Sequence, residues 1–384
     1  MENVLRRAQG LVEQFEDDVR AELPQDAEIF DAHVHLGTDI DGMRGDLDEL
    51  LRIQRAHGIT RSFMFCLDEP DRHPGFRAPN NRTLAFAERS GGEFVPFVRL
   101  DLGESPIEEA TRCLDLGAGG IKLHPRAQKF LLDDDRLAPV FELAADRRVP
   151  ILIHGGRGLP PIADDLARLV ERYPDGQLIV AHAGIADMAG LAGHLGGKAG
   201  VFFDTSVWSP LDLLDLYRLV APEQVVYASD YPYGSQPSSL LLTLRTAKLA
   251  GYSDEQLRAL FAGNARRILA GEAALEPTRP VGDDSFAQPL TFARIHQYLS
   301  MATPLLWMRQ ADTIGVLGLA LNACDERSNG HREETELIRE LLTAARDLWQ
   351  LFPEAEDETE RVRTARIAFR LVHLANITAV TSAA

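Results

Sequence analysis

The sequence has few cysteines and no long hydrophobic run. Its 384 residues include only Cys66, Cys113 and Cys324, none in a CxxC spacing, so neither a disulfide framework nor a thiolate zinc site is expected. No stretch approaches the roughly 18 consecutive apolar residues of a membrane-spanning helix. The first 23 residues are too charged for a signal peptide. These absences predict a cytoplasmic protein with no membrane partner.

Basic residues are also scarce relative to acidic ones. The chain has 40 Lys and Arg against 58 Asp and Glu, a formal net charge of −18, which repels phosphate backbones and predicts no nucleic-acid partner. A small-molecule substrate is compatible with this charge, because a metal ion or a local Arg can reverse the field inside a pocket. With 45% hydrophobic and 26% charged residues, the composition is that of a globular protein rather than a disordered one.

Eight short apolar runs recur along the first two thirds of the chain. Most of them precede a segment with helical periodicity, and continuous apolar runs are typical of strands buried on both faces. Eight strand–helix units over about 250 residues predict an α/β fold of the (β/α)8 TIM-barrel type. A doubly wound open sheet is disfavoured because no GxGxxG motif follows the first strand. The runs are 28–35, 61–67, 93–100, 119–124, 150–154, 177–182, 200–206 and 224–230.

Helical periodicity flanks this repeat on both sides. Residues 3–23 predict an amphipathic helix, whereas 272–289, rich in Pro, Asp and Ala, resemble a linker. The region after it shows only helical periodicity and is expected to pack on the barrel or on another subunit, so a homo-oligomer formed through it is one expectation. The chain is therefore divided into an N-terminal helix (1–25), a barrel (26–271) and a helical C-terminal region of unknown role (290–384).

Polar residues end most of the predicted strands. Burying an unpaired polar group is costly, and the carboxyl ends of barrel strands converge on the face where the active sites of this fold lie. This convergence predicts a functional site. The strand-ending residues are His33, His35, Arg99, Lys122, His124, His154, His182, Asp204, Ser206 and Asp230.

The sharpest motif is DAHVH at residues 31–35. Positions two apart on a strand face the same side, so His33 and His35 can offer ring nitrogens to one ion. For an isolated HxH, a pair of satisfied polar side chains is the better explanation. With His154 and Asp230 ending later strands, three imidazoles and one carboxylate form a ligand set suited to zinc, the first expectation, or to manganese or iron. Asp31 is expected either to fix an imidazole tautomer or to be a polar turn partner.

Several segments, in order along the chain, also carry a family resemblance. They resemble the amidohydrolase superfamily, specifically the amidohydrolase-related (amidohydrolase 2) branch of metal-dependent TIM-barrel hydrolases and decarboxylases. The resemblance implies a (β/α)8 barrel with one or two divalent metals, and residues 1–25 and 275–384 have no part in it. The segments are IFDAHVHLG (29–37), GGIKLHPR (119–126), PILIHGG (150–156), LIVAHAG (178–184), FFDTS (202–206), ASDYPYG (228–234) and FAGNARRIL (261–269).

The resemblance also implies roles by position. It makes His33, His35 and His154 metal ligands, and it makes Asp230 a ligand, a proton acceptor, or both. His182 matches a histidine that is a ligand in binuclear members and that orients or deprotonates water in mononuclear ones. A metal lowers the pKa of bound water toward about 7. Asp230 and His182 are therefore the expected catalytic residues, because either can take the water proton.

Four further residues are predicted to bind substrate: Arg99, Lys122, His124 and Tyr233. Arg99 suits a substrate carboxylate, with an internal ion pair as the alternative. Lys122 pairs with a nearby aspartate or a substrate carboxylate, or it becomes carbamylated and bridges two metals as in some binuclear relatives; we favour pairing. His124 shares the parity of Lys122, with a structural role as the alternative, and Tyr233 lies in the last strand–helix loop.

Three functions fit these residues. The leading hypothesis is a metal-dependent hydrolase that activates a metal-bound water to cleave a C–N or C–O bond (amide, lactone or ester) of a small molecule. The alternative is a metal-dependent non-oxidative decarboxylase or lyase acting on an unsaturated or aromatic carboxylic acid. The third is a non-catalytic metal-binding scaffold whose helical C-terminal part recruits a partner. The DAHVH and KLHP segments favour hydrolysis.

Overall fold

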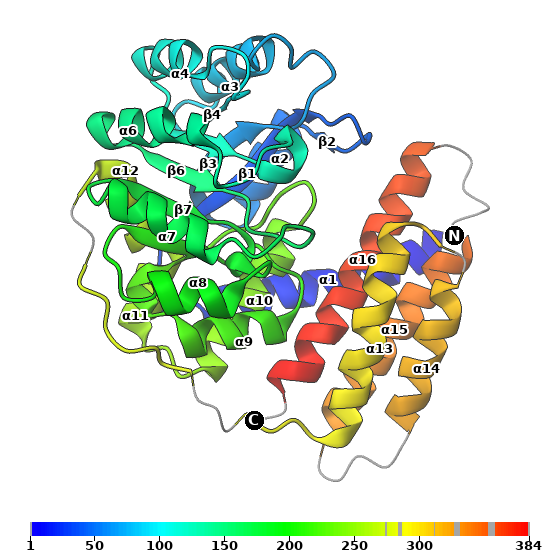
Figure 1. Cartoon of the computed structure of the whole chain (residues 1–384). Coiled ribbons are helices and arrows are strands. Elements are labelled where there is room, and N and C mark those ends of the chain that lie inside the picture. Colours follow the sequence, from blue (N-terminus) through cyan, green and yellow to red (C-terminus); the bar gives the residue numbers. More distant parts are fainter. Residues whose placement is uncertain are drawn as a thin grey trace.

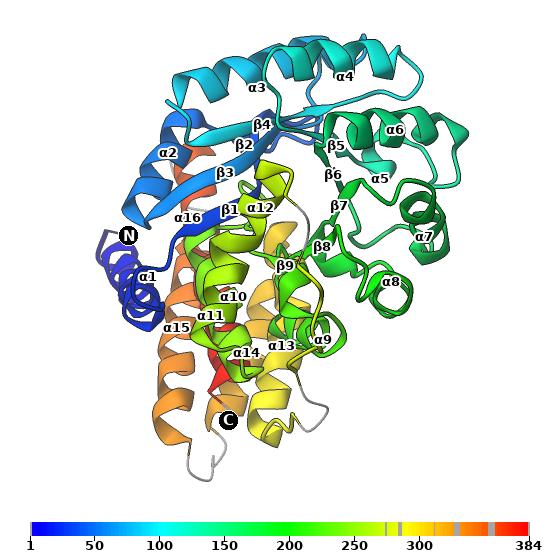
Figure 2. The same ribbon diagram turned by 90° about the vertical axis from the view of Figure 1, so that its left-hand side faces the viewer.

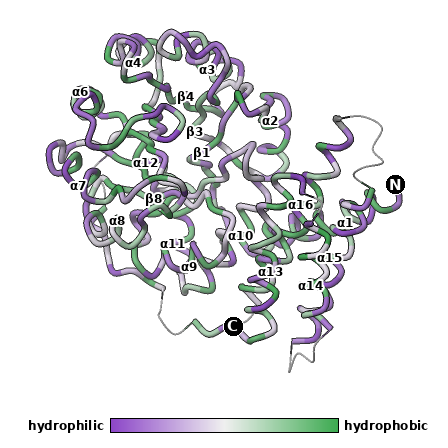
Figure 3. Tube along the Cα trace, turned by 45° about the vertical axis from the view of Figure 1, so that its right-hand side comes forward, coloured by the Kyte–Doolittle hydropathy of each residue, from purple (hydrophilic) through white to green (hydrophobic). Residues whose placement is uncertain are grey.

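A computed structural model describes the chain in six stretches. Figure 1 shows a part in which helices surround a set of strands, and a second part made of long helices beside it. In Figure 3, hydrophilic residues dominate the outer turns of the helices, as expected where they face solvent. The described stretches are 2–272, 275–282, 286–310, 312–325, 331–351 and 358–382.

The strands form one curled sheet. Among the described residues it has nine strands in the order β2-β1-β3-β4-β5-β6-β7-β8-β9, and every neighbouring pair is parallel except the β1–β2 hairpin. The eight parallel strands coincide with the eight predicted runs, which confirms the predicted fold class. The strands are β1 (Ile29–Thr38), β2 (Arg44–Gly45), β3 (Ile59–Cys66), β4 (Phe94–Arg99), β5 (Gly120–Leu123), β6 (Pro150–Ile153), β7 (Gln177–Val180), β8 (Val201–Asp204) and β9 (Val225–Val226).

Backbone hydrogen bonds join the end of the sheet to its beginning, and Figure 2 shows the strands curling round between them. The backbone N–H of Ala32 donates to the carbonyl of Tyr227 (2.8 Å), and that of Asp230 donates to the carbonyl of His33 (2.9 Å). These bonds place the segment after β9 against β1. The side chains of the DAHVH motif and of Asp230 therefore become neighbours, although almost 200 residues separate them in the sequence.

The curled sheet encloses a hydrophobic core. Its buried members alternate along the strands, as expected for side chains that point inward. Residues of the turn and helix that follow the last strand–helix unit, Ala262, Ala265 and Ile268, pack against the same core. The polar strand ends therefore project from the opposite, carboxyl-terminal end of a dry core. The strand residues of this core are Phe30, Ala32, Phe63, Phe65, Phe97, Leu152, Ile179, Ala181, Phe202, Val226 and Ala228.

Helices cover the outside of the sheet, and most bury one apolar side against it. The helices of the first part are α1 (Glu2–Glu22), α2 (Leu47–Ala56), α3 (Arg77–Arg89), α4 (Pro106–Asp115), α5 (Pro125–Gln128), α6 (Ala138–Arg147), α7 (Ala163–Arg172), α8 (Met188–Leu195), α9 (Pro210–Leu219), α10 (Gln236–Leu249), α11 (Asp254–Arg258) and α12 (Asn264–Ala270).

The C-terminal region forms four long helices that pack on one another. They are α13 (Leu290–Trp307), α14 (Thr313–Asp325), α15 (Arg332–Leu351) and α16 (Glu358–Thr381), and α16 also contacts α1, α9 and α10. The sequence predicted helices in this region and in residues 3–23, where the structure has α13–α16 and α1. The division of the chain into three parts stays a prediction. Within the described stretches, no helix combines the length and the apolar character needed to cross a membrane.

Candidate metal centre

Three of the predicted ligands converge at the carboxyl end of β1. The Nε2 atoms of His33 and His35 lie 3.2 Å apart. The Oδ1 atom of Asp230 lies 3.2 Å from the first and 3.3 Å from the second. The two imidazoles are buried, and Asp230 is nearly so. One imidazole pair and one carboxylate within a few ångströms form a donor group of the kind that holds a divalent cation.

Hydrogen bonds on the far side of each ring fix which nitrogen faces the group. The Nδ1 atom of His33 lies 2.7 Å from Oδ2 of Asp204, and that of His35 lies 3.4 Å from the carbonyl oxygen of Cys66. A carbonyl only accepts hydrogen bonds, and so does an ionised carboxylate, so in each neutral ring the proton is on Nδ1. When both rings are neutral, both Nε2 atoms direct lone pairs at each other and at Asp230, and a bound cation would convert this repulsive arrangement into a favourable one. Burial and Lys122 lower the pKa of His33, but Asp204 and Asp230 raise it above its usual value, so a proton on His33 takes the place of a cation when none is bound.

The protonation states of these groups also favour a bound cation. Burial lowers the pKa of His35 to about 3, although Asp230 opposes the shift. Burial disfavours the charged form of Asp204, but His33 and Ser206 lower the pKa of that carboxyl to about 2. His33 also holds the pKa of the Asp230 carboxyl well below its usual range against the effect of burial. Against burial, the two carboxylates in turn raise the pKa of His33, so this side of the site favours a positive charge, which a proton on His33 or a bound cation supplies.

Asp204 organises the centre; the sequence placed it among the polar strand ends but gave it no role at the metal. One of its oxygens holds the His33 ring. The other, Oδ1, accepts hydrogen bonds from the backbone N–H of His182 (2.7 Å) and from the hydroxyl of Ser206 (2.5 Å). The signal was the buried FFDTS strand end, where an aspartate follows three apolar residues. Because Asp204 contacts two of the predicted site residues at once, it sets their orientation.

His182 and His154 form a second pair beside the first. The Nδ1 atom of His182 donates to the carbonyl oxygen of Ser206 (2.8 Å), so its Nε2 atom is free to accept from Nδ1 of His154 (3.0 Å). That bond leaves Nε2 of His154 without a proton, buried and without a hydrogen-bond partner. His154 lies outside the tight group of His33, His35 and Asp230. Its role as a ligand stays a prediction.

Gly156 provides the space beside His154. A Cβ atom at this position would lie 2.8 Å from Nε2 of His154 and 3.0 Å from the ring of His182. The first distance is shorter than a Cβ contact allows and the second is at the limit, so any larger residue would shift the His154 ring. Gly156, in the HGG segment, therefore leaves space beside the unprotonated Nε2 atom of His154.

The backbone is strained at two of the predicted catalytic residues. His182 and Asp230 each have a φ of 58°, in the left-handed region that side-chain-bearing residues rarely adopt. Hydrogen bonds from the backbone N–H of His182 to the Asp204 carboxylate and from the backbone N–H of Asp230 to the His33 carbonyl hold these conformations. Strain of this kind persists where the surrounding structure determines the geometry, and it is concentrated at functional sites.

The expectation that Asp31 fixes an imidazole tautomer is wrong. Its Oδ1 atom accepts from the backbone N–H groups of His33 (3.1 Å) and Ser229 (3.0 Å), and its Oδ2 atom accepts from Gln236 (2.9 Å). The pairing of β1 with β3 shifts register between Asp31 and Val34, so Asp31 and His33 do not share a side as regular alternation predicts. Asp31 instead ties β1 to the segment that carries Asp230.

Arg99 and Lys122 lie on the other side of the mouth. They are paired residues of β4 and β5, and both are buried. Lys122 Nζ and two guanidinium nitrogens of Arg99 have no hydrogen-bond partner among the described residues. The cations instead lie over the rings of Phe65 (4.7 Å) and Phe76 (4.8 Å). Burial lowers the pKa of Lys122 to about 7, although Asp204 and Asp230 oppose the shift.

The remaining two predicted substrate residues flank the centre. The ring of His124 stacks on that of His154 at 3.9 Å, and its Nδ1 atom accepts from the backbone of Ala127 at the start of α5. His124 thus has a structural task, as its alternative proposed, beside the site. The ring of Tyr233 lies edge-on to His35 with centroids 6.0 Å apart. Roles for both in substrate binding stay predictions.

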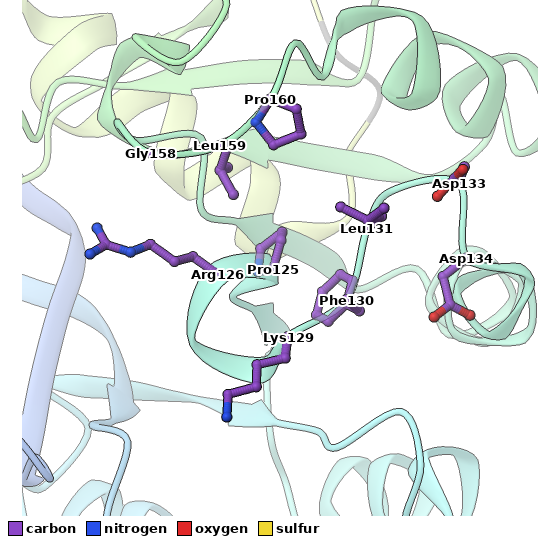
Figure 4. Close-up of a pocket in the computed structure, with 10 residues that line it drawn as sticks. All are labelled: Pro125, Arg126, Lys129, Phe130, Leu131, Asp133, Asp134, Gly158, Leu159 and Pro160. Carbon is purple, nitrogen blue, oxygen red and sulfur yellow. The ribbon is translucent and has the colours of Figure 1, made fainter.

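A pocket of about 500 Å³ adjoins the His124 side of the barrel mouth (Figure 4). The loops after β5 and β6 form it, and it has an apolar wall that includes Phe130 and Leu159. In Figure 4 the side chains of Arg126 and Lys129 point away from this wall. None of the predicted metal ligands lines the pocket, so it is a neighbour of the centre rather than the centre itself.

Comparisons with known proteins identify the family. The amidohydrolase family profile matches residues 30–270, more than half of the chain. The chain therefore belongs to the amidohydrolase family, which confirms the resemblance of its strand ends, and the family points to an enzyme. The match ends before α13, so the four C-terminal helices lie outside it. A comparison with curated protein sequences gives no match.

Solved structures support the same fold. A dihydroxybenzoic acid decarboxylase from Polaromonas sp. JS666, with bound manganese and the inhibitor 2-nitroresorcinol, has a TM-score of 0.51 and 14% identity and covers 64% of this chain and 97% of its own. A 2,6-dihydroxybenzoate decarboxylase from Rhizobium has a TM-score of 0.50, 16% identity, and coverage of 64% and 99%. The Metarhizium anisopliae IDCase in apo form has a TM-score of 0.50, 15% identity, and coverage of 64% and 98%. At these identities the similarity concerns the fold alone.

Proposed function

We propose that the chain is a metal-dependent hydrolase that cleaves a C–N or C–O bond of a small molecule. The observation that carries the proposal is the group of His33, His35 and Asp230, whose donor atoms lie 3.2–3.3 Å from one another. Hydrogen bonds to Asp204 and to the Cys66 carbonyl keep the ring protons on the opposite side. A divalent cation, zinc first and manganese or iron as alternatives, is the partner that this donor set fits.

The residues around the group would divide the chemistry. His33, His35 and Asp230 would hold the ion, with the free Nε2 atom of His154 as a fourth donor. When bound, such an ion supplies Lewis acidity and makes water a nucleophile near neutral pH. Asp230 would accept a proton from that water. His182 would exchange protons at Nε2, the atom that accepts from Nδ1 of His154, because its Nδ1 atom is held by the Ser206 carbonyl.

Arg99 and Lys122 support an anionic group on the substrate. Both side chains are buried, and Lys122 Nζ and two guanidinium nitrogens of Arg99 have no hydrogen-bond acceptor in the described part of the chain. A buried cation without a partner is unfavourable. A carboxylate would satisfy the guanidinium with two parallel hydrogen bonds. The same observation favours the second candidate, decarboxylation of an unsaturated or aromatic acid, because that reaction requires the enzyme to hold a carboxylate.

A substrate panel on the metal-loaded protein tests the proposal and separates the candidates. The panel contains amides, lactones and esters, each with and without a carboxylate, together with unsaturated and aromatic acids. Release of acid, alcohol or amine from the first group supports hydrolysis, and release of CO₂ from the second supports decarboxylation. Tight metal binding with neither product would contradict both and favour the non-catalytic scaffold. Asp230→Asn is the matched inactive control.

A further inference from the structure

A line of aromatic rings connects the candidate metal centre to the C-terminal helices. The ring of Tyr233 lies 6.0 Å from that of His35 and 6.1 Å from that of Trp307, the last residue of α13. Trp307 in turn contacts Trp208, in the loop after β8, with centroids 5.3 Å apart. Two ring contacts therefore separate an expected metal ligand from a residue outside the family match.

The C-terminal helices also hold this ring in place. Phe369 of α16 contacts both Trp307 (5.9 Å) and Trp208 (5.4 Å). His373, one turn further along α16, is buried and hydrogen-bonds the backbone of Trp208. Aromatic rings packed at these separations favour one another beyond the area that they bury. Trp307 is thus a pre-positioned ring, and a ligand that stacks on it loses little conformational entropy.

Trp307 is partly exposed to solvent. The residue is 37% exposed and the adjacent Met308 is 56% exposed, whereas Trp349 of α15 is buried. A single exposed apolar residue has little meaning. Here, however, the exposed ring is part of a cluster that begins at an expected metal ligand. Binding sites for small molecules combine a few polar groups with hydrophobic and aromatic walls in this way.

We propose that Trp307 is a specificity-determining residue of the active site. Its exposed part binds a planar, apolar part of the substrate, while the polar end of the substrate reaches the metal centre and the cations Arg99 and Lys122. The C-terminal helices then belong to the active site as a wall that residues 30–270 do not supply. The inference rests on the proposed function, because it assumes that the substrate binds at the His33 side of the mouth.

Ligand binding without turnover tests this role. Benzoate and acetate are titrated by calorimetry into the full-length, zinc-loaded protein, because they share a carboxylate and differ in the planar ring. The wild type is expected to bind benzoate more tightly. Trp307→Ala should weaken benzoate binding by about tenfold, the upper range for one aromatic contact, and change acetate binding by less than about twofold. Trp307→Phe should restore most of the preference.

Two further variants keep the test decisive. Trp307→Leu retains an apolar side chain against Trp208 and Phe369 but no planar ring, so it should lose the preference with an unchanged fold by circular dichroism. Met301→Ala removes a 51% exposed side chain from the same helix and should change nothing. Equal binding of both acids by the wild type, or an undiminished preference in the Leu variant, overturns the inference. Failure of the proposed function shows separately, as absent zinc or absent turnover in the wild type.

Discussion

The two sides of the barrel mouth favour ligands of opposite charge. On the β1 side, the donor atoms of His33, His35 and Asp230 lie within 3.2–3.3 Å of one another. On the β4–β5 side, Lys122 Nζ and two guanidinium nitrogens of Arg99 are buried with no acceptor among the described residues. The difference indicates a site built for two ligands of opposite charge, a metal cation and a substrate anion.

The largest effect is expected at Asp230, which is proposed both to hold the metal and to accept the proton of water. Asp230→Asn keeps the size of the side chain and the backbone hydrogen bond to His33, so the fold should be unchanged. Because the amide cannot accept a proton from water, kcat should fall by about 10²–10⁴-fold. Steady-state kinetics with the substrate identified by the panel measure the effect. Asp115→Asn, at an exposed ion pair with Arg147, is the control, and wild-type kinetics in the Asp230 variant would remove its proposed role.

Removal of an expected metal-binding residue should prevent the β1 side from holding its metal ion. His35→Ala deletes one of the converging nitrogen donors, and metal affinity should fall by at least about 100-fold, because changes to residues that only orient ligands already cost about 10–100-fold. Elemental analysis after dialysis against zinc measures the content. His194→Ala removes an exposed histidine paired with Asp164 and should retain the metal. Full zinc retention in the His35 variant would contradict the assigned centre.

Asp204 tests whether ring orientation matters on the same side. In Asp204→Asn a neutral amide replaces the carboxylate that holds the proton on Nδ1 of His33. Metal affinity should therefore fall by about 10–100-fold. Competition with a chromophoric chelator measures this change. Ser206→Ala removes only the hydroxyl that contacts Asp204 and should have a smaller effect. Equal affinities of the Asp204 variant and the wild type would show that Asp204 serves the fold rather than the centre.

The sequence predicts the strands and the converging donors better than the contacts between them. Most of the parallel strands are largely apolar runs, whereas the two residues of β2 carry no such signal. His33 and His35 could be found from the HxH spacing on the first strand, and Asp230 because it closes the last apolar run of the sequence. The contact of His33 with Asp204 joins residues 171 positions apart and depends on how tightly the sheet curls. The position of Asp31 depends on a register shift that is set by the pairing with β3.

The C-terminal helices show the same limit. Their periodicity predicts helices, and α13–α16 occupy the expected region. Periodicity does not determine which side of the barrel a helix approaches, because that choice depends on packing between whole elements. The contact between Trp307 and Tyr233 is therefore a tertiary feature that no local motif could indicate.

On the cation side, removing Arg99 should weaken substrate binding without affecting the metal. In Arg99→Met the guanidinium is lost but the buried stem remains, and KM for an anionic substrate should rise by about tenfold, as for one charge-assisted hydrogen bond. The KM of a neutral analogue is the matched control and should change little. Zinc content should equal that of the wild type. An equal rise in KM for the neutral analogue would indicate a structural role for Arg99.

Lys122 should make the cation side sensitive to pH. Burial lowers its pKa to about 7, so Nζ carries its charge below that pH and loses it as the pH rises. The affinity for an anionic substrate should therefore fall severalfold between about pH 6 and pH 8, one unit on either side of the pKa. Lys122→Arg keeps the charge throughout and should flatten the profile of KM, which separates this effect from ionisation of metal-bound water. A profile unchanged in the Arg variant would assign the titration to another group.

If Lys122→Met also keeps the zinc stoichiometry of the wild type, the lysine does not bridge two metals, and the cation side serves the substrate alone.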